Sequence, residues 1–242
     1  MTWLPETWLP ETPLTPPPGR KLGALTRNDR PGENCGYWAE QSDTYIIPQE
    51  EWGEWIEAGI DLRKNCNMVF DQNGIGSCAA EGACGALDIT RDVAGLPFVE
   101  FSPLFTYHTT SGGSDRGSTL NDNLRELKTT GACPEAIWPR SKGFRAKPSE
   151  EAYEAAKAYR IVEYYEIRNW LEMGSAMLQR FPVYAAYAGH AWVALKPVNT
   201  RQLTWRNSWG TSWGDGGYGV LNASRVQFSY GIYAIRTATE AD

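Results

Sequence analysis

Apolar residues recur at helical spacing through the middle of the chain, and short strand-like runs follow toward its end. Ser77 is placed to cap a helix whose apolar positions are Ala80, Ala83, Cys84 and Leu87. Further helices are expected over about 52–56, 120–127, 149–160 and 167–180. Strands are expected over 68–70, 183–187, 191–195, 202–206, 218–221 and 230–235. Helices followed by strands predict an α+β protein of two lobes.

The first 58 residues differ from the rest of the chain. They open on a five-residue repeat, Trp3–Thr7 and Trp8–Thr12, and continue through proline-rich sequence at 13–18, which favours extended polyproline conformation and builds no core of its own. A disordered tail is the plainer interpretation. Its Trp and Leu side chains could instead anchor it on the body or on a protein partner. We therefore divide the chain into an acidic, Pro-rich arm, 1–58, and a domain, 59–242.

Composition narrows the function classes. The chain has 242 residues and a net charge of −6, which argues against binding nucleic acid through phosphate contacts. No apolar run is long enough to span a membrane, and the first residues do not form a secretory signal. Five cysteines, an odd number, favour a reduced compartment, so a cytoplasmic or virion-associated protein is expected rather than a secreted one. With no CxxC pair and two histidines, no metal or other cofactor is expected.

The most informative stretch runs from Asp71 to Ala80 and contains Cys78 after two glycines and a serine, at the start of the predicted helix. Free backbone N–H groups and the positive end of the helix dipole lower the pKa of a thiol there. The alternative is a buried cysteine that acts as a small hydrophobic residue.

Two later motifs carry polar groups in apolar surroundings. His190 lies in Gly189–Val193, where a lone histidine is commonly a satisfied core residue. Asn207 opens the run Asn-Ser-Trp-Gly, followed by a glycine-rich stretch to Gly219, which taken alone is a tryptophan-rich turn.

Taken together, the motifs are specific. The order Cys78, His190, Asn207, with Gln72 six residues before the cysteine, resembles papain-like cysteine peptidases. The resemblance covers about 59–236, and the runs at 101–105 and 131–135 are similar to short prokaryotic and phage members. It implies a helical N-terminal lobe and an antiparallel β C-terminal lobe, with an active site in the cleft between them that binds a polypeptide substrate.

The resemblance also implies the role of each residue. Cys78 would be the nucleophile, held as a thiolate by His190, which later protonates the leaving amine. Asn207 would orient the imidazole, and Trp209 would shield that hydrogen bond. Gln72 would donate to the oxyanion together with the backbone N–H of the nucleophile.

For the substrate, the resemblance implies that the backbone of Gly117 pairs with the peptide and that Ile235 lines an apolar specificity pocket. Some positions depart from the family: Ile75 and Ser114 stand where relatives often have disulfide cysteines, and Ala79 stands where an aromatic residue is usual.

Alternatives remain open. One is a catalytically weak or inactive structural or assembly module of the same fold, for example in a virion, anchored by its N-terminal tail; Ala79 motivates it. Another is a cell-wall amidase of a different Cys-His lineage. The arm 1–58 is too short and Pro-rich for the usual helical inhibitory domain, although it could still occlude the cleft.

Overall fold

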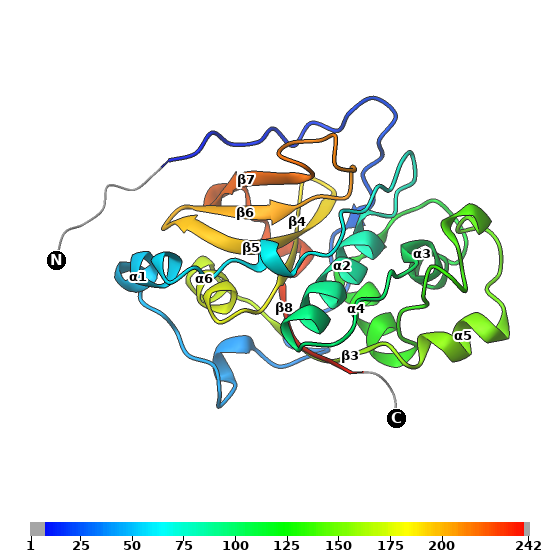
Figure 1. Cartoon of the computed structure of the whole chain (residues 1–242), viewed down its shortest axis with the longest axis horizontal. Coiled ribbons are helices and arrows are strands. Elements are labelled where there is room, and N and C mark those ends of the chain that lie inside the picture. Colours follow the sequence, from blue (N-terminus) through cyan, green and yellow to red (C-terminus); the bar gives the residue numbers. More distant parts are fainter. Residues whose placement is uncertain (1–7, 240–242) are drawn as a thin grey trace.

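The computed structural model describes residues 8–239, with side chains to Arg236, and divides into two lobes (Figure 1). The helices are α1 (Trp52–Glu57), α2 (Cys78–Val93), α3 (Pro103–Ser111), α4 (Leu120–Thr129), α5 (Glu150–Ala156) and α6 (Trp170–Leu178). The strands are β1 (Ala24–Leu25), β2 (Ser118–Thr119), β3 (Arg160–Glu166), β4 (Val183–Tyr187), β5 (His190–Asn199), β6 (Gln202–Arg206), β7 (Tyr218–Asn222) and β8 (Tyr233–Thr239). Helices α2 to α5 form one lobe, and a sheet flanked by α1 and α6 forms the other.

The sheet of the second lobe has six strands in the order β3-β8-β4-β5-β6-β7, with every neighbouring pair antiparallel. A two-residue turn, Ala188-Gly189, joins β4 to β5 with positive φ at both positions, as a tight type I′ hairpin requires. This turn places His190 at the start of β5. Because Arg206 pairs with Val193, Asn207 follows the end of β6 close to the same end of the sheet.

Helix α2 is the centre of the molecule, since every residue from Cys78 to Arg91 is buried. It packs against the sheet so closely that its glycines are required. A Cβ atom on Gly85 would lie 1.7 Å from Nη2 of Arg206, and one on Gly82 would lie 2.7 Å from the ring of Tyr184. The two glycines therefore let the helix that begins at Cys78 approach the sheet that carries His190.

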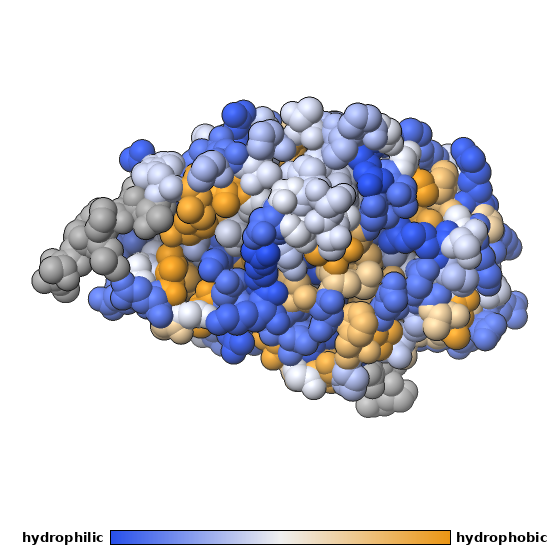
Figure 2. Space-filling model, turned by 45° about the horizontal axis from the view of Figure 1, so that its top comes forward, coloured by the Kyte–Doolittle hydropathy of each residue, from blue (hydrophilic) through white to orange (hydrophobic). Residues whose placement is uncertain are grey.

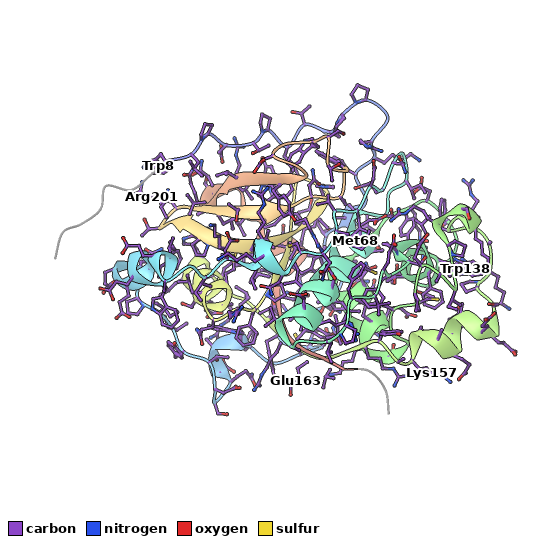
Figure 3. All side chains as sticks on the ribbon, viewed as in Figure 1. Trp8, Met68, Trp138, Lys157, Glu163 and Arg201 are labelled. Carbon is purple, nitrogen blue, oxygen red and sulfur yellow. The ribbon has the colours of Figure 1, made fainter. Side chains whose placement is uncertain are left out.

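The N-terminal arm follows the surface and then enters the body (Figure 1). Thr12 donates its N–H to the carbonyl of Val220 in β7 at 2.9 Å, and Leu9 exchanges two hydrogen bonds with the side chain of Gln202. Figure 3 accordingly shows Trp8 beside Arg201. Farther along, three fully buried side chains fix the arm to the second lobe: Trp38, Ile47 and Trp52. Residues 8–12 are thus anchored on the chain's own body.

Most of the expected elements are present, but α3 was not expected, α6 is shorter than the helix expected over 167–180, and other elements differ as follows. The helix expected to reach Arg160 ends at Ala156, and Arg160–Glu166 instead form β3, because pairing with β8 outweighs local helical preference. Met68–Phe70 form no strand; the next residue, Asp71, makes an isolated bridge to Trp209. The last strand begins three residues later than expected, at Tyr233. The α+β class itself is confirmed.

The surface is mixed in polarity, and Figure 2 shows hydrophobic residues in separate patches among hydrophilic ones. Within residues 8–239, no helix is both long and apolar enough to cross a bilayer. All five cysteines lie in the described part of the chain, and none is in a disulfide.

Candidate active site

Cys78 is the first residue of α2 and is fully buried. Its Sγ lies 4.0 Å from the carbonyl oxygen of Gly189, and the N–H of Ala191 is among the backbone groups that lower the pKa of the thiol. The sulfur therefore meets the backbone on both sides of His190.

His190 and Asn207 are joined by a short hydrogen bond, with 2.6 Å between Nε2 and Oδ1. The same Oδ1 accepts the N–H of Ser208 at 2.7 Å, so the amide oxygen faces both donors and Nε2 carries the proton. Trp209 stacks on the imidazole with 4.4 Å between ring centroids and excludes water from the bond. The other ring nitrogen, Nδ1, has no hydrogen-bond partner among the described residues.

The protonation state follows from burial. Desolvation raises the pKa of Cys78 to about 11, against the lowering effect of nearby backbone N–H groups. Desolvation lowers the pKa of His190 to about 4, against the raising effect of the Asn207 hydrogen bond. In this arrangement burial disfavours the charged form of both groups. The thiolate–imidazolium pair implied by the resemblance stays a prediction for an opened site.

Gln72 is held with its amide nitrogen toward the N-terminal arm. Its Oε1 accepts the hydroxyl of Ser208 at 2.8 Å, which leaves Nε2 as the outward donor. Nε2 donates to the carbonyl of Lys21 at 2.9 Å and to that of Ile75 at 2.7 Å. The donor that would face an oxyanion is therefore already bound to a carbonyl of the N-terminal arm.

That carbonyl belongs to a stretch that covers Cys78, which we call the covering segment, Arg20–Leu25. Ala24 donates its N–H to the carbonyl of Gly189 at 2.9 Å, and the N–H of Ser118 donates to the carbonyl of Gly23 at 2.9 Å. The backbone N–H groups of Gly23 and Ala24 lower the pKa of the Cys78 thiol. The covering segment thus contacts both lobes at the sulfur.

Two glycines make this close approach possible. A Cβ atom on Gly23 would lie 1.9 Å from the carbonyl oxygen of Gly76, and one on Gly117 would lie 2.4 Å from the carbonyl oxygen of Gly23. Gly117 also has a positive φ of 80°, which glycine adopts without strain. The sequence singled out Gly117 for backbone pairing with a substrate; in this structure the covering segment lies against it.

Ion pairs flank the covering segment. Arg20 contacts Asp71 at 2.7 Å, and Lys21 pairs with Asp115. Burial alone would raise the pKa of Asp115, but hydrogen bonds from Lys21, the Gly76 N–H and the Tyr107 hydroxyl hold that pKa below its usual range. Asp115 is therefore a charged acceptor at neutral pH.

Ile235 is fully buried, in the same hydrophobic cluster as Ala24 and Ala191. The predicted pocket residue thus belongs to the core into which the covering segment places a small side chain.

Sequence reasoning missed two groups around the site. The first is the identity of the covering segment, for which Gly23-Ala24, two small residues between leucines, is the one local signal. The second is a buried ion pair between Glu81 and Arg140, whose partners lie 59 residues apart and share no motif.

Comparisons with known proteins agree with this architecture, although no protein-family model matches the chain. An uncharacterised peptidase C1-like protein of Acanthamoeba polyphaga mimivirus is 25% identical over 213 residues, 67% of this chain and 68% of that protein. Xylellain, a cysteine protease from Xylella fastidiosa, has a TM-score of 0.61 at 21% identity, covering 88% of this chain and 99% of its own. Procathepsin L2 from the larval midgut of Tenebrio molitor has a TM-score of 0.71 at 16% identity, covering 90% and 78%. The expected papain-like two-lobe fold is confirmed.

Proposed function

We propose that this chain, which has the fold of papain-like cysteine proteases, is a cysteine peptidase whose nucleophile is Cys78. The observation that carries the proposal is the state of His190: one ring nitrogen is fixed by Asn207 under Trp209, and the other is unpartnered among the described residues. A fixed imidazole with one free nitrogen is what a general base beside a thiol requires.

The chemistry would run in two steps. With the cleft open, His190 takes the thiol proton, the Cys78 thiolate attacks the carbonyl carbon of a peptide, and Gln72 donates to the oxyanion. The C–N bond breaks as His190 gives its proton to the leaving amine, which leaves a thioester on Cys78. Water, deprotonated by His190, attacks the thioester; the acid product leaves, and the proton on His190 restores the thiol.

The structure corresponds to a covered form of this enzyme. Backbone N–H groups of Gly23 and Ala24 face the sulfur, and we infer that the covering segment blocks the nucleophile. It also occupies the donor of Gln72. We infer that the peptidase acts when this segment leaves the cleft, and that its substrate is a polypeptide.

A second candidate is an inactive module of the same fold, because a filled cleft is also what that function would show. A tail bound to a partner protein remains a prediction of that alternative.

The deciding experiment combines labelling with hydrolysis. The full chain with Gly23→Ala, designed to loosen the covering segment, is treated with E-64, the inhibitor bound to bromelain in a structure of this fold. Adduct formation at Cys78 together with cleavage of denatured protein, both lost in the Gly23→Ala/Cys78→Ala variant, is the expected result. A loosened segment with neither adduct nor cleavage contradicts the peptidase and favours the inactive module.

A further inference from the structure

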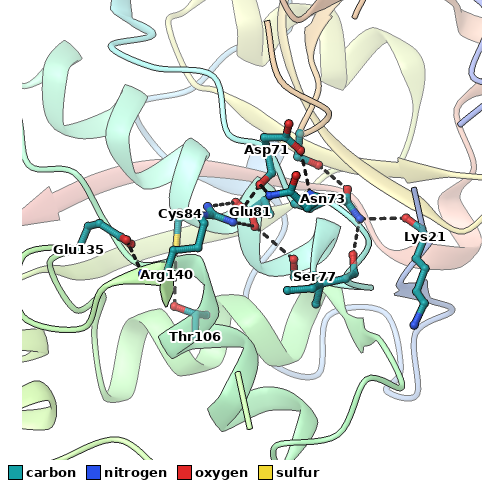
Figure 4. A network of polar contacts seen from close by, with 12 residues as sticks. Lys21, Asp71, Asn73, Ser77, Glu81, Cys84, Thr106, Glu135 and Arg140 are labelled. Atoms are coloured by element: carbon teal, nitrogen blue, oxygen red, sulfur yellow. Dashed lines mark hydrogen bonds and ion pairs between the residues drawn. The ribbon is translucent and has the colours of Figure 1, made fainter. Parts of the chain in front are cut away.

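A buried carboxylate lies one helical turn after the nucleophile. Glu81 has a side chain with no exposed surface, and the guanidinium of Arg140 binds both of its oxygens, at 2.8 and 2.9 Å (Figure 4). Its Oε1 also accepts the hydroxyl of Ser77, the residue before Cys78, at 3.1 Å. Both carboxylate oxygens are therefore occupied, in the planar geometry that arginine provides and lysine does not.

Arg140 also holds the backbone that carries the oxyanion donor. Its Nη1 donates to the carbonyl of Asp71 at 3.0 Å, while the N–H of Gln72 donates to the carbonyl of Ser208 at 2.9 Å. This carbonyl and this N–H belong to one planar peptide unit. This peptide unit is thus hydrogen-bonded on both sides, to Arg140 of the helical lobe and to Ser208 of the β lobe.

The loop that supplies Arg140 is itself tied down. The backbone N–H of Arg140 donates to the carboxylate of Glu135 (Figure 4). Arg140 is therefore held both at its backbone and at its guanidinium group. The guanidinium therefore links the segment that carries Gln72, the first turn of α2 and a distant loop.

Charge gives the pair a second role. An unpaired carboxylate on the first turn of α2 would oppose formation of a thiolate at Cys78 and act against the helix dipole's stabilisation. With Arg140 bound to both oxygens, the two charges of the pair cancel each other.

We propose that Arg140 and Glu81 are positioning residues of the proposed peptidase: Arg140 fixes the peptide unit before Gln72, and the pair keeps the surroundings of Cys78 electrically neutral. This inference rests on the proposed function. A purely structural ion pair would affect folding stability, strongly so when one buried partner is removed, and would leave the thiol pKa and kcat of the folded protein unchanged.

The test uses three full-length variants in the Gly23→Ala background: Arg140→Met, Arg140→Lys and Glu81→Gln. The thiol pKa of Cys78 is read from the pH dependence of its alkylation by iodoacetamide, followed by mass spectrometry, which requires no peptidase activity. Arg140→Met leaves the carboxylate unpaired, so it should raise the thiol pKa by roughly one unit, a tenfold loss of thiolate. Glu81→Gln leaves the cation unpaired, so it should lower the pKa.

Arg140→Lys keeps the positive charge but removes the planar guanidinium group that binds both carboxylate oxygens of Glu81. It should leave the thiol pKa in place and lower kcat at least tenfold with little change in KM, because the oxyanion donor loses its support. Lys142→Met, at the end of the 3₁₀ turn Arg140–Lys142, is the matched control and should change neither quantity.

Shifts of opposite sign in Arg140→Met and Glu81→Gln, in variants that urea unfolding shows to be folded under the assay conditions, support the inference. Shifts of one sign, or none in folded variants, overturn it. Should Arg140→Met fail to fold, Glu81→Gln and Arg140→Lys still decide. The thiol pKa could shift with opposite sign in the two variants while the Gly23→Ala chain hydrolyses no peptide. That result would support the charge balance around Cys78 and contradict only the proposed peptidase function.

Discussion

Gly23 and Gly76 meet backbone to backbone, so closely that a Cβ atom on Gly23 would lie 1.9 Å from the Gly76 carbonyl oxygen. One belongs to the covering segment and the other to the loop that precedes Cys78. Their contact leaves no room for any other residue at position 23.

The Gly23→Ala substitution should therefore release the covering segment. Backbone atoms cannot yield as a flexible side chain does, and overpacking of this kind costs roughly 1–3 kcal/mol. We expect the labelling rate of Cys78 by E-64 to rise about tenfold to hundredfold. Leu25→Ala, two residues on at an exposed position, is the control and should change the rate little. An unchanged rate in Gly23→Ala would show that the contact does not hold the segment.

The Lys21–Asp115 ion pair should matter much less. The Lys21 side chain is 56% exposed, and exposed pairs contribute about 0–1 kcal/mol. Lys21→Met should accelerate labelling of Cys78 by less than about fivefold, and added salt should have a similar small effect. A larger acceleration than that of Gly23→Ala would make the ion pair the main restraint.

Stability should depend on pH through His190. Its pKa is lowered from 6.5 to about 4 by burial, so the unfolded chain binds a proton between these values that the folded chain does not. This contribution to the free energy of unfolding is complete above pH 6.5 and is lost as the pH falls through about 4. Urea unfolding at pH 7.5 and pH 5 measures the loss, and His190→Gln should reduce it.

Gln72→Ala should lower kcat of the opened enzyme by about 10²–10³, the usual loss for one oxyanion donor. The assay compares Gly23→Ala with Gly23→Ala/Gln72→Ala on one peptide. Labelling of Cys78 by iodoacetamide, a reaction that forms no oxyanion, should stay within a few-fold. Equal kcat values would remove Gln72 from the mechanism.

Gly85→Ala should destabilise the whole molecule. The added methyl group would overlap the buried guanidinium of Arg206, and we expect a loss of roughly 1–3 kcal/mol in the free energy of unfolding. Gly53→Ala, in α1 with open space around it, is the matched control and should be neutral or stabilising. Urea unfolding of both variants separates a steric effect from a general effect of glycine replacement.

The sequence was most informative where chemistry and local pattern coincide. The regularly spaced small residues after Ser77 predicted α2, although the Ser77 hydroxyl donates to Glu81 and does not cap the helix. The Cys, His, Asn order predicted the papain-like fold. Strand β3 was not predicted, because its extended form depends on pairing with β8, far along the chain. The Glu81–Arg140 pair was not predicted either, since neither residue lies in a pattern that refers to the other. The directions of the pKa shifts of Cys78 and His190 were not predicted, because they arise from burial that includes the covering segment.

The hydrogen bonds between Thr12 and Val220 give residues 8–12 of the arm a second role, apart from covering Cys78. Strand β7 lies at the margin of the sheet, and residues 8–12 satisfy part of its outward-facing backbone. Because residues 8–12 precede the covering segment, a cut after Leu25 would separate both from the domain and expose the β7 edge to pairing with other strands. Movement of the covering segment without cleavage would keep that edge covered.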